Sequence, residues 1–169
     1  MQMGAFDQNK DRPVSVVCFT GHRRIPFDAA VRLPELLERT IADLCERGAT
    51  TFRAGGAMGF DTLAALKVLD MKETYPCIRL ELILPCRNQT ERWDAVSKQT
   101  YHYIMQKADA CRFLADVYYD GCMLERDRRL VAGSDVCVAY CAHSQGGTAY
   151  TFAHAVREGL EVINLHDFM

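Results

Sequence analysis

Apolar residues along this chain follow two spacings, one typical of buried strands and one typical of amphipathic helices. Continuous apolar runs such as 14–19 are what a strand buried on both faces requires, whereas apolar residues three or four positions apart mark helices. The predicted strands are 14–19, 50–53, 78–84, 110–114, 135–140 and 161–165. The predicted helices between them are 34–47, 59–72, 95–107, 122–131 and 148–158. This alternation indicates an α/β fold with a mostly parallel sheet and helices on both faces.

Several helix predictions rest on particular residues. Pro34 suits the first turn of a helix, Gly48 suits its end, and Asp94 can cap the third helix. The inward faces follow from the apolar spacing. They are Leu33, Leu37, Ile41 and Leu44 in the first helix, Leu63, Leu66 and Leu69 in the second, and Ala149, Phe152, Ala153 and Val156 in the last.

The composition is that of a soluble globular protein. At 169 residues, 49% hydrophobic and 25% charged, the chain is expected to form a single domain over residues 13–169. Residues 1–12 are polar and lack the apolar core of a signal peptide, which predicts a flexible tail. No apolar run approaches a membrane span, so a cytoplasmic protein without a membrane partner is expected. The net charge of −2 argues against a dedicated nucleic-acid binder.

Two glycine-rich turns, 54–61 and 145–148, each follow a predicted strand and open a predicted helix. Such a turn directs free backbone N–H groups and the positive end of the helix dipole into one crevice. A third turn, 20–24, brings the cationic side chains of Arg23 and Arg24 after the first strand. Because the carboxyl ends of parallel strands share one edge, the three turns are expected to converge. The pattern favours a phosphate-bearing ligand, above all a nucleotide.

The spacing in these turns is neither the GxGxxG fingerprint nor the phosphate loop GxxxxGK[ST]. Asp61 has two readings of equal weight: it caps its own helix, or it accepts a hydrogen bond from a ribose hydroxyl. Thr148 is predicted to cap the helix it opens and to donate to a phosphate oxygen. Trp93, the only tryptophan, has three readings: stacking on a base, covering the crevice, or the more usual simple packing.

No convincing catalytic or metal-binding set is present in the sequence. Its serines and histidines lack nucleophile-elbow or zinc-site spacing. The eight cysteines contain no CxxC pair and are interpreted as buried reduced thiols; Cys137, Cys141 and His143 come nearest to a metal cluster. We therefore predict no metal, no certain cofactor beyond a nucleotide-like ligand, and only Asp61 as a weak catalytic candidate.

The motifs taken together resemble the YpsA-like branch of the SLOG superfamily. They are Thr-Gly-His-Arg at 20–23, Gly-Gly-Ala-Met-Gly-Phe-Asp at 55–61, Leu-Pro at 84–85, Met-Leu-Glu-Arg-Asp at 123–127 and Gly-Gly-Thr at 146–148. The superfamily includes DprA and the Lonely Guy phosphoribohydrolases, and is thought to bind nucleotides or nucleotide-derived signals. The resemblance implies a Rossmann-like three-layer αβα sandwich with a mostly parallel sheet of about six strands.

The resemblance also implies a ligand pocket. Its residues would be Thr20, Gly21, His22, Arg23, Gly55, Gly56, Ala57, Gly59, Asp61, Trp93, Arg126, Gly146, Gly147 and Thr148. Two departures matter. Thr151 stands where Lonely Guy enzymes carry a glutamate, which argues against the same N-glycosidic cleavage. Asp127 stands where YpsA-like chains carry asparagine, and its charge would repel a phosphate unless it faces away.

Three functions follow as hypotheses. The leading one is a sensor or signalling module that binds a nucleotide-derived ligand, for example ADP-ribose or an NAD derivative. The second is a nucleotide hydrolase or phosphoribohydrolase with Asp61 or Asp127 as the working carboxylate. The third is DprA-like binding of single-stranded DNA, which the acidic composition disfavours. A homodimer is expected because relatives pair through helices, while the sequence leaves open whether the protein is an enzyme.

Overall fold

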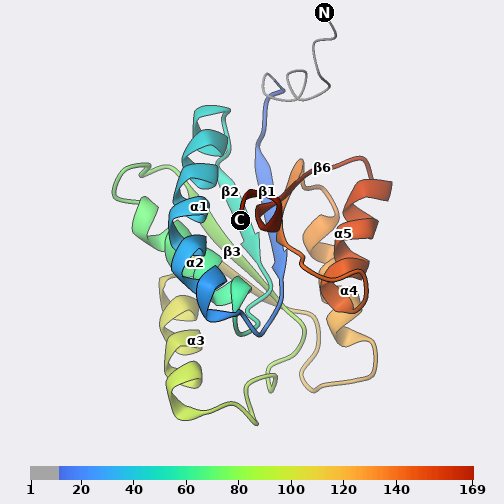
Figure 1. Cartoon of the computed structure of the whole chain (residues 1–169). Coiled ribbons are helices and arrows are strands. Elements are labelled where there is room, and N and C mark those ends of the chain that lie inside the picture. Colours follow the sequence, from blue (N-terminus) through green and yellow to red (C-terminus); the bar gives the residue numbers. More distant parts are fainter. Residues whose placement is uncertain (1–11) are drawn as a thin grey trace, which may run out of the picture.

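Six parallel strands form one sheet in the order β4-β3-β2-β1-β5-β6 (Figure 1). The structure is a computed structural model that describes residues 12–169, so the predicted tail lies outside the described residues except for Arg12. The strands are β1 (Val16–Gly21), β2 (Thr51–Ala54), β3 (Arg79–Leu84), β4 (Ala110–Phe113), β5 (Val136–Tyr140) and β6 (Glu161–Asn164). Each strand lies within one or two residues of its predicted position.

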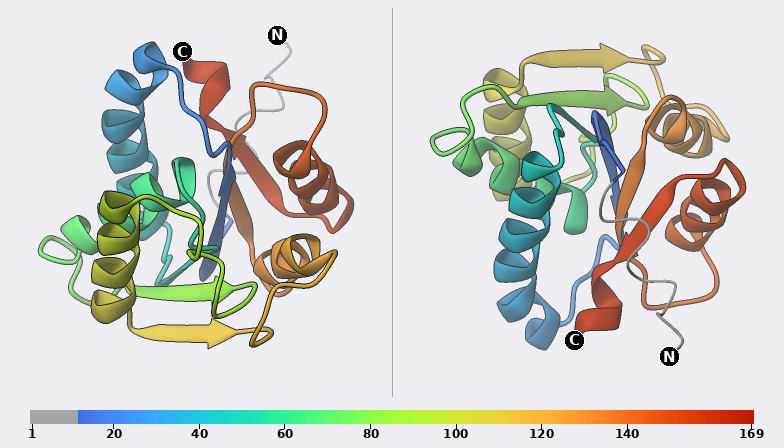
Figure 2. Two further views of the ribbon diagram at one scale, coloured as in Figure 1. Left: turned by 90° about the horizontal axis from the view of Figure 1, so that it is seen from below. Right: turned by 90° about the horizontal axis from the view of Figure 1, so that it is seen from above.

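Helices cover both faces of the sheet, which makes three layers (Figure 2). The helices are α1 (Phe27–Glu46), α2 (Phe60–Met71), α3 (Ala95–Lys107), α4 (Cys122–Val131) and α5 (Gly147–Arg157), followed by the short 3₁₀ helix η1 (Leu165–Phe168). The first three lie on one face, and α4 and α5 lie on the other (Figure 1). This confirms the predicted Rossmann-like αβα sandwich. None of the helices within residues 12–169 is long and apolar enough to span a bilayer.

The larger part of the core lies between the sheet and α1 to α3. Phe19 of β1 stacks on Phe52 of β2 with ring centroids 6.0 Å apart and meets Phe60 of α2 edge-on at 6.3 Å. All three side chains are fully buried. Burying each one contributes roughly 2–3 kcal/mol relative to an exposed side chain. This packing fixes the start of α2 against the end of β1, and so sets the position of the two turns.

The predicted start of the first helix is wrong. The helix begins at Phe27, directly after Pro26, and Pro34 lies inside it. The apolar spacing that points inward extends upstream to Ala29, and this face buries five residues in all. A proline inside a helix loses one backbone hydrogen bond, but burial of the whole apolar face offsets that loss.

Two inward faces also differ from the prediction. Helix α2 turns Phe60, Ala64 and Val68 to the core, while the predicted leucines are half-buried. Helix α5 buries Thr151 and Ala155. Val156 of the predicted α5 face is exposed. In α5 the buried residues are short, because a helix can approach a sheet closely only where side chains are short, whereas the buried face of α2 also carries the large Phe60.

Candidate functional site

The carboxyl ends of β1, β2 and β5 bring the three predicted turns together. We call them the first turn (20–24), the second turn (54–61) and the fifth turn (145–148), after the strand that each one follows. Strand β1 lies between the other two, and its last residue, Gly21, is opposite Tyr140 at the end of β5. A cavity of about 230 Å³ opens at this edge. It is lined by Phe19, Thr20, Gly21, His22, Arg23, Ala57, Asp61, Met123, Arg126, Asp127, Leu130, Gly147 and Thr148. Nine of the fourteen predicted ligand-binding residues therefore share one cavity.

The other predicted residues lie around the cavity without lining it. Gly55, Gly56, Gly59 and Gly146 belong to the two turns themselves. Trp93 is half-buried and meets Tyr101 edge-on, with ring centroids 5.6 Å apart. Of its three predicted readings, packing is the one that this contact supports.

Sequence reasoning found only part of one wall of the cavity. Helix α4 contributes Met123, Arg126, Asp127 and Leu130. These residues are three or four positions apart in a helix that the sequence predicts correctly. That spacing places them on one face of the helix, and it could have identified them together. Resemblance alone singled out Arg126.

Arg126 is the central cation of the site, and its side chain is nearly fully buried. Its Nε donates to Asp127 Oδ1 at 2.7 Å, and its Nη1 donates to the Gly55 carbonyl at 2.5 Å. Its remaining terminal nitrogen, Nη2, lies 3.8 Å from the Met123 sulfur, which is a weak acceptor. The guanidinium therefore keeps donor capacity directed at the cavity.

A second guanidinium points to the same sulfur. Arg23, which belongs to the first turn, places its Nη2 3.9 Å from Met123 Sδ. Arg23 is exposed, whereas Arg126 is buried. Two arginines that converge on one neutral atom form an arrangement that suits an anion, because guanidinium groups donate strong, charge-assisted hydrogen bonds to phosphate oxygens.

Asp127 does not face away from the site. Its side chain lines the cavity, is buried, and forms an ion pair with Arg126. The expected repulsion of a phosphate is therefore reduced by a neighbouring opposite charge rather than by distance.

Asp61 is a buried acid within the same cavity. Its Oδ2 accepts a hydrogen bond from the Ala57 N–H at 3.2 Å, and the residue that caps α2 is Gly59. The prediction that Asp61 caps its own helix is therefore wrong, since its bond goes to the preceding turn. Burial raises the pKa of Asp61 to about 6; Arg126 opposes that rise and Asp127 adds to it.

In the second turn, 54–61, two of the backbone N–H groups donate to the protein itself. The N–H of Ala57 is bound by Asp61, and the N–H of Phe60 donates to the His22 carbonyl at 3.1 Å. Gly59 has a φ of +78°, and a Cβ built there would lie 2.3 Å from the Arg23 carbonyl oxygen. Only glycine fits this position without moving backbone.

The fifth turn, 145–148, keeps its donors free of protein partners. Within residues 12–169 the structure records no hydrogen bond from the N–H of Gly146, Gly147 or Thr148. A Cβ at Gly147 would meet no atom within 4 Å. The predicted capping role of Thr148 is wrong, because the helix starts one residue earlier and Gly146 occupies the cap without a side-chain bond.

His22 joins the first turn to the segment that precedes the fifth turn. Its Nε2 accepts a hydrogen bond from the Ala142 N–H at 2.9 Å, and its ring lies 4.8 Å from the ring of His143. Burial, then the neighbouring His143 and His166, lower the pKa of His22. The imidazole is thus favoured in its neutral form with the proton on Nδ1.

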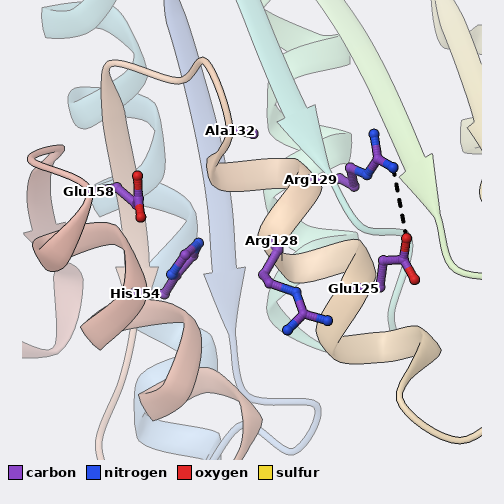
Figure 3. A pocket seen from close by; sticks show the side chains of 6 residues that line it. All are labelled: Glu125, Arg128, Arg129, Ala132, His154 and Glu158. Carbon is purple, nitrogen blue, oxygen red and sulfur yellow. Dashed lines mark ion pairs between the residues drawn. The ribbon is translucent and has the colours of Figure 1, made fainter.

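A larger hollow of about 560 Å³ lies away from this edge, between α4 and α5 (Figure 3). It is lined by Glu125, Arg128, Arg129, Ala132, His154 and Glu158. Arg129 and Glu125 form an ion pair at 3.8 Å across one helical turn. These are exposed side chains of both signs, typical of a solvated helix surface, and none of the predicted site residues lies here.

All eight cysteines are free thiols. Cys18, Cys86, Cys122 and Cys137 are buried, whereas Cys77 and Cys111 are exposed, so the prediction of buried thiols holds for only part of the set. Among the described residues no group of three or more His, Cys, Asp or Glu side chains is arranged to hold a metal ion.

Comparison with known proteins agrees with the resemblance and the fold. The family model described as the YspA SLOG family matches residues 17–163. UPF0398 protein BH1768 of Halalkalibacterium halodurans is 30% identical over 132 residues, which are 76% of this chain and 67% of that protein. UPF0398 protein BBR47_29830 of Brevibacillus brevis is 26% identical over 121 residues, or 70% and 64% of the two chains. The chain thus spans about two thirds of the length of these relatives.

Among solved structures, DNA processing protein A (DprA) from Streptococcus pneumoniae superposes with a TM-score of 0.64 at 16% identity. The match covers 90% of this chain and 50% of that one. DNA processing protein A from Helicobacter pylori, described for its single-stranded DNA binding mode, gives 0.59 at 22% identity and covers 90% and 65%. At these identities the likeness shows the fold alone.

Proposed function

The chain belongs to the YspA SLOG family, and from that premise we propose that it binds a nucleotide or a nucleotide-derived ligand, such as ADP-ribose or an NAD derivative, as a sensor or signalling module. The observation that carries the proposal is the pair of arginines, Arg23 and Arg126, that converge on Met123 in the cavity that the fifth turn also lines. An anionic group there would meet two guanidinium groups and the start of α5.

The fifth turn supplies the backbone part of the proposed phosphate site. The N–H groups of Gly147 and Thr148 have no protein acceptor among residues 12–169, and both residues line the cavity. Such donors at the N-terminus of an eleven-residue helix favour a bound anion by charge and by hydrogen bonding. We assign the phosphate to this turn rather than to the second turn, because protein atoms crowd the glycines of the second turn whereas Gly146 and Gly147 face open space.

The size of the cavity limits what it encloses. About 230 Å³ is less than the space that a whole drug-sized ligand fills. We propose that the cavity holds one phosphate and its ribose, with Asp61 beside the sugar, and that the rest of the ligand lies along the sheet edge. The expected homodimer remains a prediction that light scattering would check.

A thermal-shift panel tests the proposal. Wild-type protein should be stabilised by at least one of ADP-ribose, NAD, AMP and cyclic nucleotides, by about 2.7 kcal/mol at a ligand concentration one hundred times Kd. Arg126→Gln should lose the effect, and Arg128→Gln, a matched change on the exposed side of the same helix, should retain it. If no member of the panel shifts the melting temperature, the proposal fails.

Because Arg126→Gln leaves Asp127 without its ion-pair partner, that variant can lose stability as well as binding. Arg23→Gln provides a second variant. Arg23 is exposed and its loss leaves no buried charge unpaired. It should fold normally and still weaken the nucleotide-induced shift.

Hydrolysis of a nucleotide is a second candidate, favoured by Asp61. A buried carboxyl with a pKa of about 6 exchanges protons near neutral pH, as a general acid or base must. Chromatography of a nucleotide panel after incubation would reveal released base or phosphate. Turnover that persists unchanged in Asp61→Asn would remove Asp61 from this role.

Binding of single-stranded DNA is a third candidate, favoured by the fold shared with the two DprA proteins. It predicts salt-sensitive binding of an oligonucleotide, measured by fluorescence anisotropy. The net charge of −2 weighs against it. A flat titration at low salt would eliminate this candidate.

A further inference from the structure

One hydrogen bond connects two turns that lie 120 residues apart in the sequence. The Ala142 N–H donates to Nε2 of His22 at 2.9 Å. His22 belongs to the turn after β1, and Ala142 belongs to the segment 141–146 between β5 and α5. That segment leads directly into Gly147 and Thr148, the open donors of the proposed phosphate site.

We infer that His22 is a positioning residue that holds the segment 141–146, and with it the donors of the fifth turn, only while its imidazole is neutral. The inference rests on the proposed function, since it concerns how the same site is set up and regulated. It gives His22 a different task from ligand contact, because Nε2 is already engaged by the protein.

The chemistry of imidazole supplies the dependence on protonation. Neutral His22 accepts at Nε2, but its protonated form carries N–H groups at both ring nitrogens and accepts nothing. The Ala142 N–H would then face another N–H at a distance that suits only a donor and an acceptor. Protonation therefore replaces an attraction with a repulsion and frees the segment from Ala142 onward, while Cys141 stays bonded to Asn164.

The groups packed around His22 add to the effect. From β5, Tyr140 meets the His22 ring edge-on with centroids 5.6 Å apart, and from the next segment His143 lies 4.8 Å away. From η1, His166 meets Tyr140 at 6.0 Å, and Arg23 adjoins His22 in its own turn. The ionisable neighbours that act on the His22 pKa, His143 and His166, are both cationic when protonated. A positive charge on His22 is thus opposed from two elements.

The direction with pH follows from linkage. Since the pKa of His22 is lower in the folded protein than in a free histidine, the hydrogen bond contributes stability above the ordinary value of 6.5 and loses it as pH falls. Asp61 works in the opposite direction, because protonation removes a buried negative charge beside the proposed anion site. The test must therefore separate the two groups.

Ligand-free ¹⁵N-labelled protein gives the first readout. Between pH 8 and pH 5 the amide signals of Ala142, Gly146 and Gly147 should move together with the titration of the His22 ring. In His22→Gln the amide oxygen of the new side chain can accept from Ala142 at every pH, so these shifts should flatten. In His143→Gln, the matched control, the amide signals should still follow the His22 titration. The midpoint should move to higher pH, because one neighbouring positive charge is gone.

The second readout is the affinity for ADP-ribose at pH 7.5 and pH 5. The ratio of the two Kd values should change at least threefold between wild type and His22→Gln, and Asp61, present in both proteins, cancels in this comparison. Equal ratios, or Ala142 signals that ignore the His22 titration, would overturn the inference. If ADP-ribose and the other nucleotides bind at neither pH while the amide signals follow His22, the proposed function fails and the link between the turns stands.

Discussion

The two glycine-rich turns at the carboxyl edge look alike in sequence but differ in what surrounds them. In the second turn, 54–61, the protein itself binds the N–H groups of Ala57 and Phe60 and fills the space above the glycines. In the fifth turn, 145–148, the donors have no acceptor within residues 12–169, and a Cβ at Gly147 would meet nothing. A glycine that packing does not require, in a turn whose donors are open, is where a ligand is expected to approach the backbone.

The largest effect is expected from Gly59→Ala in the second turn. The positive φ and the Arg23 carbonyl, 2.3 Å from the added Cβ, both oppose a side chain. We expect a loss of roughly 3–5 kcal/mol in the free energy of unfolding, measured by urea denaturation. A loss below about 1 kcal/mol would show that the second turn adapts, and the contrast between the turns would weaken.

The burial of Asp61 in the second turn can be tested by comparing how the stabilities of the wild type and Asp61→Asn change with pH. The pKa of Asp61 rises on folding from 3.8 to about 6, so the wild-type protein should lose stability as pH increases through that range. Relative to Asp61→Asn, the wild type should lose about 2–3 kcal/mol between pH 4 and pH 7.5. Parallel stability curves for the two proteins would contradict the assigned burial.

Gly55→Ala is expected to have an intermediate effect. Its Cβ would lie 2.7 Å from Arg126 Nη1, at the end of a side chain that can shift. We expect roughly 1–2 kcal/mol of destabilisation together with weaker nucleotide binding, because the displaced guanidinium also loses its bond to the Gly55 carbonyl. A calorimetric titration that finds unchanged affinity would remove Arg126 from the proposed ligand site.

The order of strands and helices could be predicted because each element has a local pattern of apolar residues. Runs of apolar residues located all six strands, and the alternation with helices placed the three turns at one edge. Contacts between residues far apart in the sequence could not be predicted in this way. Neither the bond from His22 to Ala142 nor the bond from Arg126 to Gly55 leaves a trace in local spacing.

Helix α5 shows a second reason for failure. Its apolar pattern pointed to Val156, but the helix packs through Thr151 and Ala155. The Thr151 hydroxyl bonds the Gly147 carbonyl one turn earlier at 3.0 Å, so this polar residue is satisfied where it is buried. Periodicity ranks faces by hydrophobicity, whereas close packing on a sheet selects short side chains. The same limit hid the exact start of the helix, which is why the capping role predicted for Thr148 is wrong.

The most direct test of the central claim is a calorimetric titration of ADP-ribose into wild type and Gly147→Ala. Alanine at this position meets no atom and favours a helix, so the free energy of unfolding should change by less than about 1 kcal/mol. If the fifth turn receives the phosphate, Kd should nevertheless rise at least tenfold, which corresponds to about 1.4 kcal/mol. Equal affinity of the two proteins for ADP-ribose, or a failure of the wild type to bind any nucleotide, would contradict the account.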